Sequence, residues 1–450
     1  GLCLECEPGS GGVHPFCREC LENWHDKAER FFCPSCKRDV VHERTKFVDE
    51  QGRKSTVPPQ GLEWMTPGLL DNYNIRTAVL WCQMNRTTTQ PAHGSMKDWN
   101  VSRVTDMTSL FGQYASFNAD ISGWDMTNVN DTSHMFHEAS SFNQDLSKWD
   151  LSRVVDMRGM FANAENFNSP LFKIGRECAA SDMGYMFENA SSFNQDLSHW
   201  NVENVTDMTA MFAGAENFNS PLFKIGTPNN VEYLSAMFTY ASSFNQDLSH
   251  WNVDGVVSMS RMFAGATDFN SPLFKIGTPN KVVHMQDMFE RATSFDQDLS
   301  HWNVDNVVNM AEMFTEATNF NSPLFKIGTP NKVENMRGMF SSAVSFDQDL
   351  SHWNVDNVVD MKMMFFAATA FNSPLFQPNV ARLQTVQDMF NGAIEFEFSD
   401  SDTDAWRLVS DSDTIDKAGF TSWTVYERLR LNDELNDEER RRKRRREHLV

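Results

Sequence analysis

The 450-residue sequence predicts an α/β solenoid, a stack of about twelve coils of 25 or 26 residues each. Two observations support this fold class. A Phe residue recurs every 25 or 26 residues, and the spacings alternate over the middle of the array, which gives a 51-residue super-repeat. Apolar residues also return at the same positions in each repeat, as expected where each repeat buries its apolar face only against its neighbours. The recurring residues are Phe111, Phe136, Phe161, Phe187, Phe212, Phe238, Phe263, Phe289, Phe314, Phe340, Phe365 and Phe390.

The N-terminal segment, residues 1–38, holds six of the eight cysteines as three Cys-x2-Cys pairs. This spacing lets two thiolates reach one zinc ion from a tight turn, and a segment this short cannot bury enough apolar surface to fold unaided. The alternative is a set of disulfides in a small secreted module. The three pairs, together with His14, favour zinc. The pairs are Cys3 and Cys6, Cys17 and Cys20, and Cys33 and Cys36.

This segment resembles a RING finger through Cys3-x2-Cys6, His14-x2-Cys17-x2-Cys20, Trp24 and Cys33-Pro34-Ser35-Cys36-Lys37. The resemblance implies one or two Zn²⁺ ions in a cross-brace. By this resemblance Cys3, Cys6, Cys17 and Cys20 form one site, and His14, Cys33 and Cys36 belong to the other. It also implies a contact with a ubiquitin-conjugating enzyme through Trp24, Pro34 and Lys37, although Trp24 is equally consistent with a core aromatic under the zinc loops.

The segment departs from the RING pattern at two positions. Gly12 stands where the family has a Cys ligand, so the second site has three clear ligands, and water or His25 is left to supply a fourth. Glu5 stands where RING fingers active in ubiquitin transfer usually have an aliphatic residue. RING fingers position a charged partner for attack and hold no nucleophile or general base, so no catalytic residue is expected here.

Residues 39–67 are polar, contain Pro58 and Pro59 and show no lasting periodicity, which is typical of a linker. In the repeats that follow, each coil is expected to combine a short helix with an extended segment. The apolar residues of one coil follow the spacing of a helical stripe, and residues 320–327 then read as extended. The stripe consists of Val307, Met310, Met313, Phe314 and Ala317.

Several columns of similar residues run through the array. The Met residues are expected to fill gaps in the core. The His column has a spacing of two coils, about 10 Å, which is too wide for one zinc ion. An Asn column is expected to point inward and to satisfy backbone groups. The His column is His199, His250, His301 and His352, and the Asn column is Asn118, Asn143, Asn168, Asn194, Asn219, Asn245, Asn270, Asn321 and Asn372, with Asp296 and Asp347 in two coils.

Two charged rows have no evident role in packing. The two rows are explained either by duplication of the repeat together with a need for solubility, or by a regularly charged face that binds an extended protein or glycan ligand. The acidic row is Asp145, Asp196, Asp247, Asp298 and Asp349, and the basic row is Lys173, Lys224, Lys275 and Lys326.

The array resembles the BspA-like leucine-rich repeats, the 26-residue bacterial surface-protein repeat of DUF285 type. The resemblance rests on residues 99–125, WNVSRVTDMTSLFGQYASFNADISGWD, and continues to about residue 396. It implies a right-handed, leucine-rich-repeat-like solenoid over residues 99–396 that is used for adhesion or partner binding. Residues 68–98 look like the N-terminal cap of that family, with a helix near Ile75 that covers the first coil.

After Phe390 the repeat fades, and residues 397–450 read as an acidic C-terminal cap with a charged, Arg-rich tail. Residues 440–446, RRRKRRR, carry +7 of the net charge of −22, so the remainder carries −29. This cluster reads as a nuclear localisation signal, as a nucleic-acid-binding arm, or as an exposed helix end paired with Asp437, Glu438 and Glu439. The acidic body itself argues against a nucleic-acid surface on the repeats.

Two functions follow from these features. The first is an E3 ubiquitin-ligase-like adaptor, in which zinc loops recruit a conjugating enzyme and the solenoid binds a protein substrate. The second is a non-enzymatic interaction or surface-adhesion protein with a structural zinc finger. The RING-like segment favours an intracellular site, cytoplasmic or nuclear, with the cell surface as the alternative. No stretch of 18 or more apolar residues is present, so no membrane span is expected.

Overall fold

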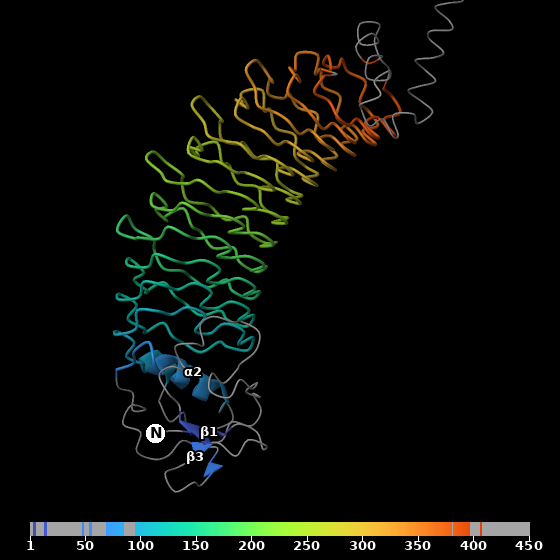
Figure 1. Cartoon of the computed structure of the whole chain (residues 1–450). Helices are drawn as coiled ribbons and strands as arrows, with labels where there is room; N and C mark the ends of the chain where they lie inside the picture. Colours follow the sequence, from blue (N-terminus) through green and yellow to red (C-terminus); the bar gives the residue numbers. More distant parts are fainter. Residues whose placement is uncertain are drawn as a thin grey trace, which may run out of the picture. The chain divides into compact units, whose positions relative to one another are not determined.

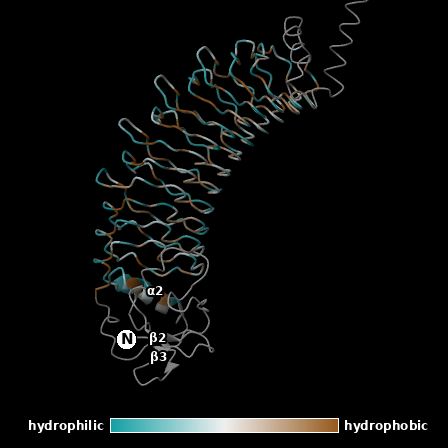
Figure 2. Ribbon diagram, in the orientation of Figure 1, coloured by the Kyte–Doolittle hydropathy of each residue, from teal (hydrophilic) through white to brown (hydrophobic). Residues whose placement is uncertain are grey.

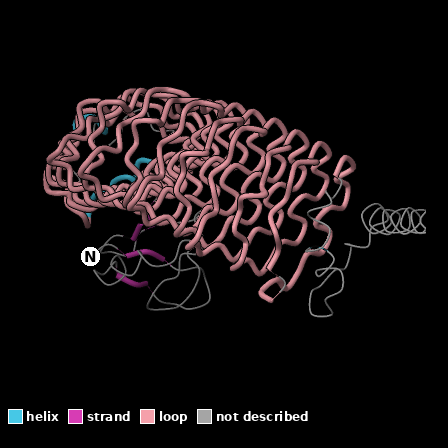
Figure 3. The backbone as a smooth tube through the Cα atoms, turned by 90° about the horizontal axis from the view of Figure 1, so that it is seen from above, coloured by secondary structure: helices cyan, strands magenta, loops and turns pink. Residues whose placement is uncertain are grey.

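The structure is a computed structural model. It describes residues 3–5, 13–15, 47–48, 54–55, 69–84, 95–379, 381–396 and 406. The chain divides into two compact units, Gly1–Val104 and Thr105–Val450. In the described part of the first unit, the strands are β1 (Cys3–Glu5), β2 (Val13–Pro15), β3 (Phe47–Val48) and β4 (Lys54–Ser55), and the helices are α2 (Asn74–Met84) and the 3₁₀ helix η3 (Met96–Asp98). These elements are labelled or coloured in Figures 1 and 3.

The four short strands form one antiparallel sheet in the order β2-β1-β3-β4. Leu4 of β1 lies opposite His14 of β2 and Phe47 of β3. The two strands β3 and β4 therefore give regular pairing to part of residues 39–67, the range read as a linker in the sequence.

Helix α2 begins at a reciprocal pair of polar side chains. Oδ1 of Asp71 accepts the N–H of Asn74 at 3.1 Å, and Oδ1 of Asn74 accepts the N–H of Asp71 at 2.8 Å. These bonds satisfy backbone donors that a helix start leaves without partners. Ile75 is fully buried, so the helix that the sequence predicts near this residue is present and packs an apolar side.

The second unit is a repeat solenoid whose coils follow one another in sequence order (Figure 1). One residue of each coil forms an isolated parallel bridge with the matching residue of the next coil, and we call this the bridge position. The bridge positions are Asp106, Asp131, Asp156, Asp182, Asp207, Tyr233, Ser258, His284, Asn309, Asn335, Asp360 and Thr385.

The helix predicted over Val307–Ala317 is wrong, because residues 311–316 form turns and alternate N–H groups of the stretch bond to the next coil. The N–H of Glu312 donates to the carbonyl of Arg337 (2.7 Å), and that of Glu316 donates to the carbonyl of Ser341 (2.8 Å). Both donors have a positive φ, 57° and 58°, which breaks any helix while keeping apolar side chains on one side. The segment 320–327 likewise contains no strand. Figure 3 shows the coils as loops throughout.

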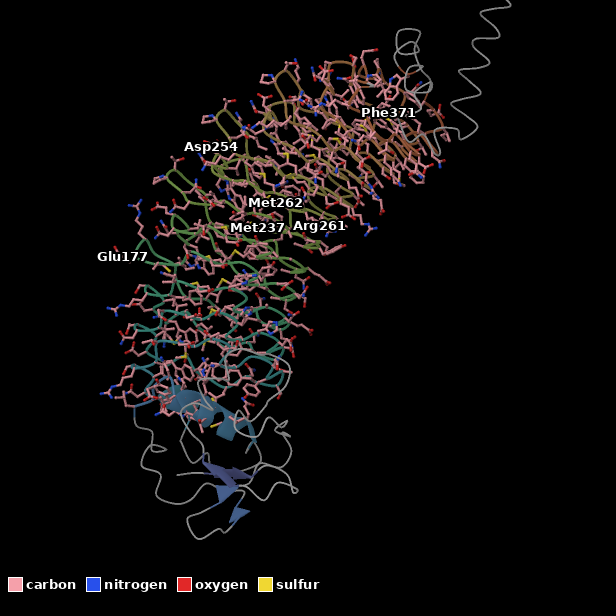
Figure 4. The ribbon with its side chains drawn as sticks, viewed as in Figure 1. Glu177, Met237, Asp254, Arg261, Met262 and Phe371 are labelled. Carbon is pink, nitrogen blue, oxygen red and sulfur yellow. The ribbon has the colours of Figure 1, made fainter. Side chains whose placement is uncertain are left out.

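The core is a ladder of aromatic rings with methionines beside it. Phe136 stacks on Phe142 of its own coil at 4.0 Å and on Phe161 of the next coil at 5.3 Å between ring centroids. All three rings are fully buried, as are Met237 and Met262. The expected packing role of the Met column is therefore confirmed. In Figure 2, hydrophobic and hydrophilic segments alternate within each coil. In the view of Figure 4, the label of the buried Met262 lies between the labels of the exposed residues Asp254 and Arg261.

Candidate interaction surface

The residues expected to bind zinc or a conjugating enzyme are mostly outside the described part of the chain. Cys3 and His14 belong to β1 and β2, which pair with each other. Among the residues that the structure describes, no three His, Cys, Asp or Glu side chains come close enough to hold a metal ion. The residues outside the described part are Cys6, Cys17, Cys20, Trp24, Cys33, Pro34, Cys36 and Lys37.

Cys82 of helix α2 and Cys178 of the solenoid are free thiols with raised pKa values. Burial raises the pKa of Cys82 to about 11 and also raises the pKa of Cys178. Since the thiolate is the reactive form, neither cysteine is prepared to act as a nucleophile at neutral pH.

The Asn column is a structural ladder, as expected, but its side chains are exposed and do not point inward. Oδ1 of Asn143 accepts the N–H of Asn168 on the next coil, and the N–H of Asn143 donates to Oδ1 of Asn118, both at 2.9 Å. Where Asp replaces Asn the role continues, since Oδ1 of Asp296 accepts the N–H of Asn321 at 2.8 Å. Each amide therefore satisfies a backbone donor that no bridge reaches.

The exposed acidic row also has a structural role. Oδ1 of Asp247 accepts the N–H of Ser249 at 2.8 Å, and the Ser249 hydroxyl adds a second hydrogen bond that lowers the pKa of Asp247. The same turn recurs at Asp145, Asp196, Asp298 and Asp349. These carboxylates thus stabilise local turns. The four residues of the basic row are exposed, and Lys275 lies at a bridge with Asn252.

A different surface is built by the residue at the bridge position and by the residues 2, 3, 6 and 7 positions after it. We call this surface the bridge face. Its backbone is held by bonds to the next coil at alternate residues, and the positions 3 and 7 carry a positive φ in most coils. In one coil these are Tyr185 (60°) and Asn189 (53°), and in another Ala236 (56°) and Tyr240 (55°).

Residue types on the bridge face change from coil to coil, whereas the Phe, Asn and Asp columns repeat. Position 3 passes through His134, Gly159, Tyr185 and Ala210, and position 7 through Glu138, Asn163, Asn189, Gly214 and Tyr240. Two large apolar side chains of one coil are exposed here, Tyr233 at 42% and Tyr240 at 52%. Packing of the coil does not require these side chains. Sequence reasoning missed this surface, and the signal that was available is the variation between constant Met and Phe positions.

The C-terminal part of the bridge face contains a network of ion pairs between coils. Arg291 donates from Nε and Nη2 to the carboxylate of Glu316 at 3.0 and 3.2 Å. Arg261 lies 3.5 Å from Glu290, and Arg337 lies 3.7 Å from Glu312. The arginines are about half exposed, so these pairs contribute little to stability.

Asp287 lies inside this network in an environment that disfavours its ionised form. Its pKa is raised to about 6, chiefly by burial and also by the carboxylates of Glu290 and Glu312, against the opposing effect of Arg261. Arg261 Nε is 3.9 Å from the Asp287 carboxylate. The carboxylate of Asp287 therefore takes up a proton near pH 6.

The N-terminal part of the bridge face is rich in carboxylates. The bridge positions from Asp106 to Asp207 are all Asp, and the Oδ1 of each accepts a hydrogen bond from the N–H two residues later. Arg158 lies 3.6 Å from Asp182 and 4.6 Å above the ring of Tyr185. Burial, with Asp207 and Asp156 adding to it, raises the pKa of Asp182.

The sequence matches the model of one protein family along most of the solenoid. The family is DUF285, described as a Mycoplasma protein of unknown function, and it matches residues 80–175, 176–276, 256–331 and 329–421, more than half of the chain. The chain belongs to the DUF285 family. The bridge face and the Asn ladder therefore lie within the DUF285 repeats.

Comparison of this DUF285 protein with solved structures finds a likeness to the crystal structure of a TLR13-ssRNA13 complex. The identity is 10% and the TM-score 0.20, and the match covers 77% of this chain and 59% of that chain, so it spans less than two thirds of the other protein's length. Among curated proteins no match is found. In the described part of the DUF285 chain, no helix has the length and apolar character needed to cross a membrane.

Proposed function

We propose that the DUF285 solenoid of this protein is a non-enzymatic interaction module that binds a protein partner through the bridge face. The observation that carries the proposal is the coil-to-coil variation on this face, where Tyr185, Tyr233, Tyr240 and the three arginines Arg261, Arg291 and Arg337 lie. Tyr and Arg are the residue types that dominate binding energy at protein interfaces. A repeated scaffold with varied contact positions is how solenoids achieve specificity.

Site-specific photo-crosslinking tests this proposal. A photoreactive phenylalanine analogue is placed at Tyr240 on the bridge face or, as a matched control, at the exposed Lys275, and the cells are irradiated. We expect protein adducts from position 240 and few from position 275. Adducts from position 275 alone would contradict the proposal and place the interface near the basic row.

Two finer structural features belong to the same proposal. They are a right-handed stack of about twelve coils, and a RING-like module in residues 1–38 that binds one or two Zn²⁺ ions and recruits a ubiquitin-conjugating enzyme. The support for the zinc module is the three Cys-x2-Cys pairs and His14. Departures at Glu5 and Gly12 favour a structural zinc finger over ligase activity, and the DUF285 repeats favour presentation at a cell surface over an intracellular site.

Measurements of zinc content and of ubiquitin transfer distinguish a structural zinc finger from a ubiquitin-ligase-like adaptor. We expect the purified full-length chain to carry one or two equivalents of zinc by atomic emission, and Cys17→Ser to carry less. Ubiquitin chains formed with a panel of conjugating enzymes would support the adaptor function, and zinc without chains would support the structural finger. A chain that carries no zinc when purified under reducing conditions contradicts both.

A further inference from the structure

The bridge face has two electrostatically different halves. At its five defined positions, the coils from Asp106 to Gly214 place seven carboxylates and one arginine, Arg158. The coils from Ser258 to Ser342 place four carboxylates and three arginines, and there each arginine pairs with a carboxylate of another coil. We call the first of these halves the acidic half. The carboxylates of the acidic half are Asp106, Asp131, Glu138, Asp156, Asp182, Glu188 and Asp207.

Arg158 demonstrates how the acidic half holds a cation. Its guanidinium lies over the ring of Tyr185 and beside the carboxylate of Asp182. Cation–π contact and charge pairing act together on one guanidinium in this arrangement. The bridge pairs repeat the carboxylate one coil apart, about 4.8 Å, so a row of cations along the stack would meet a carboxylate at each coil.

The charge needed to match this row is present elsewhere in the same chain. Residues 440–446, RRRKRRR, carry seven consecutive positive charges, while the rest of the chain carries −29. We propose that this segment docks on the acidic half of the bridge face of its own chain. The inference names an occupant for the face, and so rests in part on the proposed function.

The length of the chain allows this contact. Trp406 is buried and lies 6.0 Å from both Phe376 and Phe390, so the chain is fixed to the last coils at that point. Seven bridge pairs separate Asp207 from Thr385, which corresponds to about 34 Å along the stack. Trp406 and Arg440 are separated by 33 residues, and a random coil of that length has a root-mean-square end-to-end distance of about 32 Å. The segment therefore reaches the acidic half without extension to its limit.

The docked segment would cover the carboxylates that a basic partner needs. A partner of the bridge face would then compete with residues 440–446, and binding would depend on salt, because exposed charge pairs weaken as ionic strength rises. Removal of the segment would expose the acidic half. The proposal thus makes the tail an internal competitor for the interaction surface.

In some coils of this chain, Asn occupies the bridge position in place of Asp and preserves the hydrogen bond of the turn without the charge. Asn309 and Asn335 occupy the bridge position in later coils, and their Oδ1 atoms accept the N–H of Ala311 and Arg337 at 3.0 Å as the Asp residues do. The triple variant Asp131→Asn, Asp156→Asn and Asp207→Asn therefore removes three charges and retains the hydrogen bonds. The matched control, Asp196→Asn, Asp247→Asn and Asp298→Asn, makes the same charge change in turns outside the bridge face.

The test is carbodiimide coupling in the full-length chain without any partner, followed by digestion and mass spectrometry. The amine of Lys443 and a nearby carboxylate condense to an amide, and the carbodiimide takes up the elements of water to become a urea. We expect Lys443 adducts at Asp182 and Glu188, at least a fivefold loss of these adducts in the bridge-face triple variant, and no more than a twofold change in the control. In the wild-type chain, about 1 M salt should abolish them.

Three results would overturn the proposal. One is coupling of Lys443 only to Asp437, Glu438 and Glu439, and another is an equal loss of adducts in both triple variants. The third is coupling mainly between labelled and unlabelled chains in an isotope mixture, which would assign the contact to a second copy. Photo-crosslinking of a partner at Tyr240 is a separate measurement, so the tail contact can fail while the proposed function stands.

Discussion

The ring of Tyr240 lies over Gly265, the residue at the same position of the next coil. A Cβ on Gly265 would overlap Cδ1 of this ring and lie 2.7 Å from Cε1, and Gly265 has a φ of 69°. The same relation joins His134 with Gly159 and Asn189 with Gly214. Each of these three side chains is thus accommodated by a glycine one coil further along.

This relation predicts the effect of Gly265→Ala. The substitution places a Cβ in the left-handed region and against the Tyr240 ring, so we expect a loss of about 2 kcal/mol in the free energy of unfolding, measured by denaturant titration. In the double variant with Tyr240→Ala, part of the loss should return, because the contact is relieved. Gly277→Ala serves as the control, since a Cβ there meets no atom within 4 Å. Equal losses at the two glycines would contradict the role of the ring.

The raised pKa of Asp287 predicts a pH-dependent stability. Its pKa is about 6 in the folded chain against an ordinary value of 3.8, so its contribution to stability is present at low pH and is lost as the pH rises through 6. We expect Asp287→Asn to be more stable than the wild type by about 1 kcal/mol at pH 7, after screening of a partly exposed group.

At pH 5 the advantage of Asp287→Asn should be about half as large, because the carboxyl is then protonated in the folded chain but ionised in the unfolded chain. Thermal unfolding followed by calorimetry at both pH values measures this. An advantage of Asp287→Asn that grows at pH 5 would contradict the assignment. Asp254→Asn, at an exposed residue outside the network, provides the comparison.

From the Asn ladder we predict that the stability of the solenoid depends on the acceptor oxygen of the column residue more than on the charge of that residue. Asn143→Ala removes the acceptor of the Asn168 N–H and of the Ser169 hydroxyl, and we expect a loss of about 1 kcal/mol. Asn143→Asp should lose less, since Asp296 and Asp347 fill the same role. Denaturant titration of the three proteins ranks them. A ranking in which Asp is worse than Ala would show that the ladder depends on the amide nitrogen.

The ring ladder predicts a large cost for Phe161→Ala. Phe161 is fully buried and stacks on Phe136, Phe167 and Phe187 at 5.3, 4.2 and 5.4 Å. Truncation leaves a cavity between three coils, and we expect a loss of about 3–5 kcal/mol. For Phe161→Leu we expect a loss of about half that size in the free energy of unfolding. Hydrogen exchange should also locate the weakened coils around residue 161, whereas uniform weakening along the array would argue against nearest-neighbour stacking.

The sequence predicted the period, the ring column and the core Met residues because each is a repeated apolar requirement. It did not predict how the backbone meets that requirement. Spacing such as Val307, Met310 and Phe314 is shared by a helix and by a chain that alternates in φ, and bonds to the next coil select the second. The exposed Asn143 was expected inside because a column of amides suggests buried polar groups, although its acceptor serves a backbone donor at the surface. Tyr240 and Arg261 belong to no column, and so a search for repetition passes over them.

The alternate N–H groups of the bridge face have a consequence for the electric field of the solenoid. The N–H groups of Met107, Ser109, Phe111 and Gln113 all donate forward to the next coil, and this direction is kept up to the bonds that reach Gln387, Met389 and Asn391. Peptide dipoles on this face therefore point the same way along the stack, as they do in a helix, although the coils contain none. Their carbonyl ends face the coil of Asp106, so the backbone adds negative potential at that pole of the stack and positive potential at the other.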